Sequence, residues 1–233
     1  MICIPVVAST QAEALQFIAR SAGLADILEL RMDLLADGDL KGLLTAARTA
    51  APAVRVLVTN RPGAATEAEK ERIDVLLEAV NLGADYVDLE LTTAAVWREK
   101  VRALIGLNEG RTRLIISHHD FERTPPRRDL IGLFNEAVRS GAQVTKIVTM
   151  ARSPQDNLTL LSLLPYARRR NWEIVAFCMG EQGKMSRVMA PLLGALFTFG
   201  ALEQGFESAP GQLTVTEMRQ ILQAMGGKEH DNA

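Results

Sequence analysis

Short runs of apolar residues alternate with longer stretches of helical periodicity along all 233 residues of the chain. The short runs are rich in Val and Ile and are bounded by Gly, Pro, Asn or Asp, which is typical of buried β-strands. We expect strands at 2–8, 27–33, 55–60, 86–91, 113–120, 144–151, 173–180 and 198–202. The stretches between them predict helices, among them 11–22, 68–82, 93–107, 126–140 and 154–169. Two of these begin with a proline at the first helical position, Pro126 and Pro154.

This alternation predicts an α/β protein with the (β/α)8 TIM-barrel fold, because about eight strand–helix units in an uninterrupted chain are what the barrel needs. A doubly wound open sheet would alternate in the same way. However, the first strand is not followed by the G-x-G-x-x-G of a dinucleotide site. No linker or low-complexity stretch divides the chain. We therefore expect a single barrel domain over 1–226 and a polar C-terminal tail at 227–233.

Lys146 lies in the middle of the apolar run "VTKIVTM" (144–150). A lysine is seldom fully buried, because its ammonium group must be paired or must lose its proton. The residue could lie on an exposed edge strand, form a buried ion pair, or show that the strand prediction is wrong. The remaining explanation is a neutral amine that acts as a nucleophile. This stretch alone leaves all four open.

Polar residues gather toward the carboxyl ends of the expected strands. Glu29, Arg31 and Asp33 alternate with apolar residues in the second strand, although Asp33 could equally cap a helix. The others are Arg61 after the third strand, Asp88 and Glu90 in the fourth, and His118, His119 and Asp120 at the end of the fifth. Parallel barrel strands are usually apolar on both faces, so these charges need a reason. In a TIM barrel this is the end at which active sites lie.

Imine chemistry would explain a lysine that lies next to a histidine. Strands five and six would be neighbours about 4.8 Å apart, which places a histidine beside Lys146. A neutral amine attacks a carbonyl, the iminium acidifies the adjacent C–H bond, and a histidine moves the proton. A metal site in "HHD" (118–120) is the weaker interpretation, because neighbouring strand residues face opposite ways. We expect no metal and no other cofactor.

Six short motifs occur in register along nearly the whole chain: "ELR" at 29–31, "DLEL" at 88–91, "SHHDF" at 117–121, "TKI" at 145–147, "MSR" at 185–187 and "SAPGQ" at 208–212. Together they resemble the type I 3-dehydroquinate dehydratase family of the shikimate pathway, which serves aromatic amino acid biosynthesis. The resemblance implies a TIM-barrel hydro-lyase that converts 3-dehydroquinate into 3-dehydroshikimate through a lysine Schiff base.

The resemblance also implies a role for particular residues. Lys146 would form the Schiff base and His119 would be the general acid and base. The substrate-binding residues would be Glu29, Arg31 and Arg61 at the ring hydroxyls and Arg187, Ser208 and Gln212 at the carboxylate. Apolar walls would come from Phe121, Met179 and Phe199, and we expect Asp88 and Glu90 to support Lys146 and His119 from behind.

The chain departs from the family at three places. His118 stands where the family often has Asn, so two adjacent histidines compete for one role. Ala65 stands where relatives carry a glutamate that supports the catalytic histidine, so either Glu67 or another group has to orient His119. Ser9 is only a weak candidate for a family serine near the first strand.

Composition narrows the remaining alternatives. With 48% hydrophobic residues and a net charge of −2, the chain lacks the basic surface of a nucleic-acid-binding protein. It has neither a membrane-length apolar run nor a signal-peptide pattern, and Cys3 and Cys178 lie in apolar runs. We therefore expect a cytoplasmic enzyme with a small-molecule substrate, acting as a homodimer. Another Schiff-base barrel, such as a small class I aldolase, is the alternative, although "MGEQGKMS" (179–186) does not match a phosphate loop and predicts a mobile loop instead.

Overall fold

The structure is a computed structural model that describes residues 1–62 and 69–226. Its strands form one parallel sheet in the order β7-β6-β5-β4-β3-β2-β1-β8. They are β1 Ile2–Val6, β2 Ile27–Arg31, β3 Arg55–Thr59, β4 Tyr86–Glu90, β5 Arg113–Asp120, β6 Val144–Met150, β7 Glu173–Met179 and β8 Thr198–Phe199. The sheet almost closes, because β8 pairs with β1 and the N–H of Leu196 donates to the carbonyl of Ile174 at 2.8 Å. The predicted (β/α)8 barrel is confirmed.

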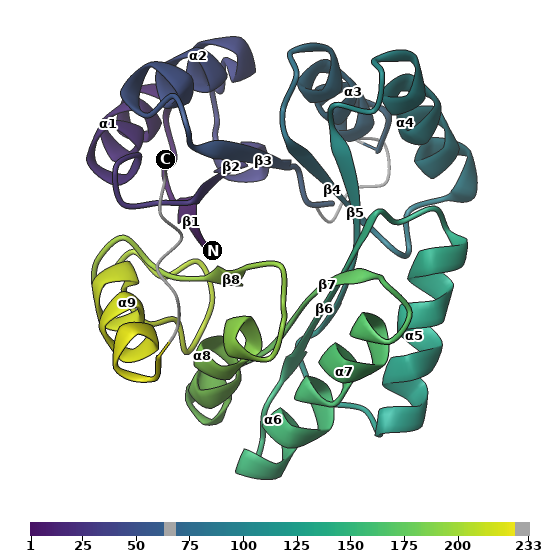
Figure 1. The fold of residues 1–233 in the computed structure, drawn as a ribbon. Helices are drawn as coiled ribbons and strands as arrows, with labels where there is room; N and C mark the ends of the chain where they lie inside the picture. Colours follow the sequence, from purple (N-terminus) through teal and green to yellow (C-terminus); the bar gives the residue numbers. More distant parts are fainter. Residues whose placement is uncertain (63–68, 227–233) are drawn as a thin grey trace.

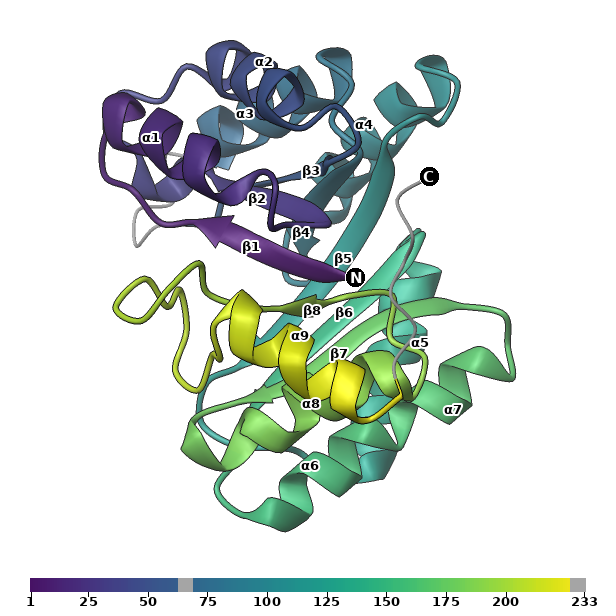
Figure 2. The same ribbon diagram turned by 60° about the vertical axis from the view of Figure 1, so that its left-hand side comes forward.

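Helices surround the sheet on its outer side (Figures 1 and 2). They are α1 Gln11–Ser21, α2 Leu40–Ala50, α3 Glu69–Asn81, α4 Ala95–Leu107, α5 Arg127–Arg139, α6 Pro154–Leu161, α7 Leu163–Arg168, α8 Lys184–Leu192 and α9 Val215–Ala224, with short 3-10 turns at η1 Met32–Leu34 and η3 Glu181–Gly183. Capping boxes begin α1 and α9, since Thr10 and Thr214 exchange hydrogen bonds with a glutamate three residues on. Within the described parts of the chain, no helix is long and apolar enough to cross a membrane.

The predicted strands are all present, and most of the differences concern helices. The expected helix 154–169 is two helices, because Pro165 has no N–H to donate to the carbonyl of Leu161, where α6 ends. Pro154 occupies the first position of α6, but Pro126 lies one residue before α5. The second strand ends at Arg31, two residues early, since the chain turns into η1. The region expected to be a mobile loop at 179–186 forms η3 and the start of α8 instead.

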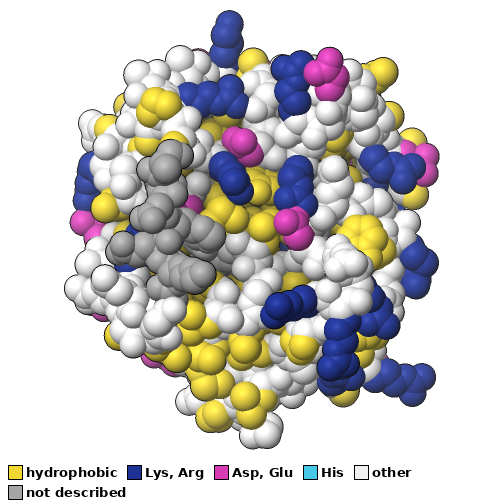
Figure 3. Space-filling view, viewed as in Figure 1, with side chains coloured by type: hydrophobic (Ala, Val, Ile, Leu, Met, Phe, Trp, Pro, Cys, Tyr) yellow, Lys and Arg dark blue, Asp and Glu magenta, His cyan; other side chains and the backbone are white. Residues whose placement is uncertain are grey.

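The inner face of the barrel changes character along the strands. Side chains near the strand beginnings form an apolar cluster that includes Ile27, Leu57, Ile115 and Val144. Lys146 lies two residues beyond Val144 and therefore on the same face, above this cluster. Figure 3 shows the face at which the strands begin, where hydrophobic, acidic and basic side chains are mixed. The barrel is thus filled by apolar groups at this end, and its polar inner residues belong to the other.

Candidate active site

A cavity of about 490 Å³ lies at the carboxyl ends of the strands. It is bordered by all eight side chains that the sequence singled out for the site: Glu29, Arg31, Arg61, His119, Lys146, Arg187, Ser208 and Gln212. Apolar groups complete the lining, among them Phe121, Phe177, Met179 and Phe199. The barrel therefore brings together in space residues that lie as far apart in the sequence as Glu29 and Gln212.

Lys146 is buried on β6, with only 4% of its surface exposed. Its Nζ lies 3.0 Å from Oδ2 of Asp88 and 4.6 Å from the centre of the Phe199 ring. Because β6 has neighbours on both sides, the explanations by an exposed edge strand and by a wrong strand prediction are excluded. The lysine forms a buried ion pair, and the aromatic face beside it favours a cation at this position as well.

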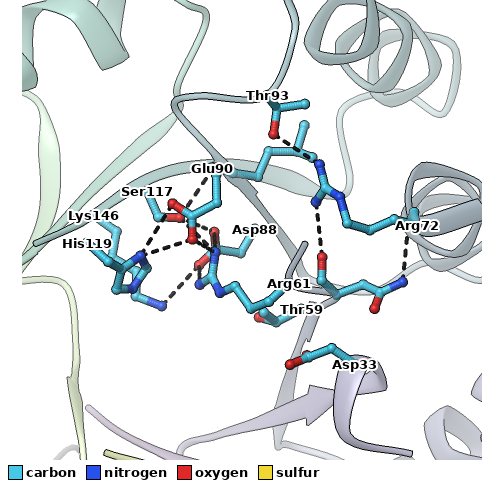
Figure 4. A network of polar contacts seen from close by, with 12 residues as sticks. Asp33, Thr59, Arg61, Arg72, Asp88, Glu90, Thr93, Ser117, His119 and Lys146 are labelled. Carbon is cyan, nitrogen blue, oxygen red and sulfur yellow. Dashed lines mark hydrogen bonds and ion pairs between the residues drawn. The ribbon is translucent and has the colours of Figure 1, made fainter. Parts of the chain in front are cut away.

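Arg61 shares the carboxylate of Asp88 with Lys146 (Figure 4). Its Nη1 and Nη2 donate to the two oxygens of Asp88 at 2.9 and 2.7 Å, and Nη1 also donates to Ser117 Oγ at 2.9 Å. Burial alone would raise the pKa of Asp88, but the charges of Arg61 and Lys146 hold that pKa well below its ordinary value. Asp88 is therefore an anion at neutral pH, with two cationic partners.

His119 is held by a carboxylate from the neighbouring strand. Its Nδ1 lies 3.0 Å from Oε1 of Glu90, which also accepts a hydrogen bond from Arg61 at 2.6 Å. Burial lowers the pKa of His119 and the charge of Arg61 lowers it further, while Glu90 acts in the opposite direction. The imidazole is thus neutral at pH 7 and able to accept a proton. Glu90 fills the orienting position, and both Ala65 and Glu67 lie outside the described residues.

Arg187 is a fully buried cation that also lines the cavity. Its Nη2 donates to the carbonyl of Pro210 at 3.2 Å, and its guanidinium carbon lies 4.5 Å from the centre of the Phe177 ring. Nε and Nη1 have no hydrogen-bond partner among residues 1–62 and 69–226. Burial lowers the pKa of Arg187 to about 10. A buried guanidinium with two free donors is costly alone and is matched by a carboxylate ligand.

The segment that carries Ser208 and Gln212 passes close to Arg187. Gln212 accepts a hydrogen bond from the backbone N–H of Ser208 at 2.8 Å and donates to its hydroxyl at 3.1 Å. Gly211 has a φ of 79°, and a Cβ there would collide with the carbonyl of Gly180. A glycine is therefore required for this segment to approach the end of β7 so closely.

Glu29 and Arg31 lie toward the carboxyl end of β2, and both line the cavity. Thr59 donates to Oε1 of Glu29 at 2.7 Å, which fixes a buried carboxylate. Arg31 donates from Nε and Nη2 to the two oxygens of Asp33, at 3.0 and 2.6 Å. Asp33 is therefore the partner of an arginine of the cavity, and the alternative that it caps a helix is wrong.

Other candidates lie at the edge of the cavity or outside it. Strand alternation predicts that His118 points toward the helices, but His118 also borders the cavity. Phe121 stacks on the His119 ring at 5.9 Å, but 68% of its surface is exposed, so it belongs to the rim. Ser9 hydrogen-bonds Glu13 and borders a separate hollow. Sequence reasoning assigned no role to Ser117, although its position two residues before His119 places it on the same strand face.

Comparison with known proteins decides the family. The family model described as type I 3-dehydroquinase matches residues 2–229. The chain belongs to the type I 3-dehydroquinase family. A relative from Desulfotalea psychrophila, named 3-dehydroquinate dehydratase, is 34% identical over 224 residues, which cover 94% of this chain and 96% of the relative. A relative of the same name from Methanopyrus kandleri is 37% identical over 205 residues, covering 87% and 88%.

Solved structures of the type I 3-dehydroquinase family have the same fold. The 3-dehydroquinate dehydratase from Geobacillus kaustophilus superposes with a TM-score of 0.83 at 25% identity, covering 98% of this chain and 92% of that one. The enzyme of that name from Aquifex aeolicus gives a TM-score of 0.78 at 26% identity, covering 96% and 98%. A 3-hexulose-6-phosphate synthase reaches a TM-score of only 0.60 at 16% identity, which is a likeness of fold alone.

Proposed function

We propose that this chain is a 3-dehydroquinate dehydratase that removes water from 3-dehydroquinate to form 3-dehydroshikimate through an imine on Lys146. The observation that carries the proposal is a single cavity that holds a buried lysine amine, a neutral histidine and a buried arginine, two of whose nitrogens have no hydrogen-bond partner in the described part of the chain. Family membership supports the choice of substrate, since relatives that bear this name cover nearly the whole chain. The reaction belongs to the shikimate pathway.

Lys146 and His119 carry the proposed chemical steps. The neutral amine adds to the C3 ketone, and His119 assists the loss of the carbinolamine water. The same histidine then removes a proton from C2 while the iminium accepts the electron pair. The C1 hydroxyl leaves with the proton that His119 returns, and hydrolysis of the imine frees the product and the lysine.

Asp88 and Arg61 explain how the lysine could change its charge. When the amine gives up its proton, Asp88 keeps the two hydrogen bonds from Arg61 and is not left as an unpaired buried anion. When the iminium forms, its positive charge lies next to the carboxylate of Asp88, 3.0 Å from the lysine nitrogen. Because this carboxylate is already in place, it stabilises the charge without rearrangement.

Binding is divided between two groups of residues that line the cavity. Arg187, with Ser208 and Gln212, would hold the substrate carboxylate through the free donors of its guanidinium. Glu29 and Arg31 would contact the ring hydroxyls, together with Arg61. The carboxylate anchor at C1 and the nucleophile at C3 then fix the two atoms on either side of C2, so that the C2–H bond faces the histidine.

Reduction with borohydride tests the covalent step. Substrate and borohydride together should inactivate the enzyme and add one reduced substrate to the peptide that contains Lys146. Lys146→Ala should take up no label and show no turnover. Lys184→Ala is the matched control, because Lys184 is half-exposed and pairs with Glu181. This variant should stay active and should still be labelled on Lys146. Label on Lys184 in the wild-type enzyme, or none on either lysine, would contradict the proposal.

The wider setting of the enzyme is also proposed. We place it in the cytoplasm as a homodimer that acts on a small molecule and needs no metal or other cofactor, with residues 1–226 as the catalytic domain and 227–233 as a polar tail. The tail lies outside the described residues. The alternative of a small class I aldolase is not favoured, since the relatives cited above bear the dehydratase name.

A further inference from the structure

Arg72 is a buried arginine that lies outside the cavity. It belongs to α3, and only 6% of its surface is exposed. Its Nε and Nη2 donate to the two oxygens of Glu69, at 2.7 and 2.8 Å. Nη1 donates to the carbonyl of Asn60 at 3.0 Å, and Nη2 also donates to Thr93 Oγ1 at 3.0 Å. The guanidinium therefore joins its own helix to two separate loops (Figure 4).

Both loops directly follow strands that carry site residues. Asn60 is the residue before Arg61, and its side-chain amide donates back to the carbonyl of Arg72 at 3.3 Å. Thr93 lies three residues after Glu90, and its N–H donates to the Glu90 carbonyl at 3.0 Å. Arg72 thus connects the carboxyl end of β3 with that of β4 on the outer side of the barrel.

The same two strand ends are joined on the inner side by Arg61. Its side chain extends from the end of β3 to Asp88 and Glu90 on β4. Glu90 in turn holds the ring of His119. The separation between β3 and β4 at this level therefore determines how Arg61 meets Glu90, and through Glu90 where the imidazole lies.

We propose that Arg72 is a positioning residue that sets the distance between Arg61 and Glu90, and thereby the orientation of His119. This inference rests on the proposed function of the site. It needs an arginine in particular, because only the planar fork can reach two loops and a carboxylate at once. A lysine keeps the charge but presents a single nitrogen, so it would pair with Glu69 and release at least one loop.

Three substitutions separate positioning from stability. Arg72→Lys keeps the charge and loses the fork. Thr93→Val keeps the size of the side chain and removes only the hydrogen bond from Arg72 to the β4 loop. Glu69→Gln is the control, because Glu69 contacts Arg72 from the same helix, and the substitution leaves the partners of Arg72 in the two loops, Asn60 and Thr93, unchanged. Thermal unfolding of each variant reports the purely structural contribution.

The first readout follows His119 without any need for turnover. The chain has three histidines, so ring signals in NMR spectra of histidine-labelled protein can be assigned with His→Gln variants and titrated. His119 is faced by Glu90 and Asp88 from β4, by Arg61 from the end of β3 and by Lys146 from β6. Burial and Arg61 lower its pKa more strongly than Glu90 raises it. Loosening the β3–β4 contact should therefore raise the pKa of His119 in Arg72→Lys and Thr93→Val, and Glu69→Gln should leave it unchanged.

The second readout is turnover of 3-dehydroquinate. Misplacement of a reacting group by about 1 Å can cost about a hundredfold in rate, so Arg72→Lys should lose about ten- to a hundredfold in kcat and Thr93→Val less, with KM nearly constant. The inference is overturned if both variants only melt earlier while the pKa of His119 and kcat stay at wild-type values. It is also overturned if Glu69→Gln changes both as much as Thr93→Val does. If the wild-type enzyme shows no turnover of 3-dehydroquinate but the pKa of His119 still rises in Arg72→Lys and Thr93→Val, the proposed function is wrong. The positioning role of Arg72 would then still hold.

Discussion

At the scale of single residues, Arg187 combines a cost in stability with a proposed gain in binding. A buried guanidinium without an anionic partner is expensive to keep in a folded protein. Arg187→Met retains most of the volume and removes the charge, so it should leave the free energy of unfolding unchanged or raise it. The same variant should lose about 2–5 kcal/mol of substrate binding, as is common when one partner of a desolvated charge pair is removed.

Arg187→Lys is the matched comparison, because it keeps the charge without the bidentate fork. It should bind substrate with an affinity between those of the wild type and Arg187→Met. Urea unfolding and KM for 3-dehydroquinate measure the two effects on the same samples. An unchanged KM in Arg187→Met would show that Arg187 does not bind the substrate carboxylate and has only a structural role in α8.

The two adjacent histidines should fail in different ways. Positioned acid–base groups contribute roughly 10²–10⁴ in rate, so His119→Ala should lose at least that much turnover while borohydride still traps some imine on Lys146. His118→Ala should retain much of the activity, since the hydrogen bond to Glu90 belongs to His119. Turnover, trapped mass and circular dichroism distinguish the variants. If His118→Ala is inactive and His119→Ala remains active, the acid–base role belongs to His118.

The sequence indicated most of the cavity residues, because motifs and strand alternation both locate a side chain on a face. Alternation applied one step further would also have placed Ser117 on the inner face with His119, and the register between β5 and β6 sets it opposite Lys146. Asp88 and Glu90 were expected to support Lys146 and His119, but alternation alone could not tell which carboxylate holds His119. The answer depends on the register between β4 and β5, in which Glu90 lies opposite Ser117, and neither strand specifies that register by itself.

At the scale of elements, strands were easier to predict than helices. The strand runs are continuous and β-branched, and β5 has the predicted bounds 113–120. Three helices, α2, α8 and α9, were not among those named in advance. In α8, Gly183 precedes the first turn and Pro191 lies near the end, so residues that usually break helices stand at both of its termini.

The capping box of α9 should matter for stability and not for chemistry. Thr214 Oγ1 accepts a hydrogen bond from the N–H of Glu217, and the Glu217 side chain accepts one from the N–H of Thr214. Thr214→Ala should therefore lower the free energy of unfolding by about 1 kcal/mol, a typical value for the loss of an N-cap, with kcat unchanged. Thr49→Ala is the control, since Thr49 is an exposed residue inside α2. Equal losses in both variants, measured by urea unfolding, would argue against the cap.

At the scale of the whole molecule, the barrel concentrates its buried charges in one layer. An apolar cluster fills the barrel where the strands begin, and helices cover its outside. The carboxyl ends of the strands are where Asp88, Glu90, Arg61 and Lys146 meet. Such a network is weak evidence for stability, because desolvation offsets much of the attraction. Its protonation is nonetheless linked to folding, since a group whose pKa differs between the folded and unfolded chain makes stability depend on pH.

The lowered pKa values of Asp88, Glu90 and His119 all predict a fold that is less stable in acid. Folding lowers the pKa of Asp88 and Glu90 from 3.8 and 4.5, so their contribution is present above those values and is lost as the pH falls through the lower folded ones. Folding also lowers the pKa of His119 from 6.5, so the unfolded chain binds that proton first and stability begins to fall below pH 6.5. Urea unfolding of three proteins isolates the histidine contribution: wild type, His119→Gln and His118→Gln. The pH should run from about 5 to 8, which covers both sides of the ordinary histidine pKa. The loss between neutral pH and pH 5 should shrink in His119→Gln and persist in His118→Gln, whereas equal slopes in all three proteins would show that His119 is not held neutral by the fold.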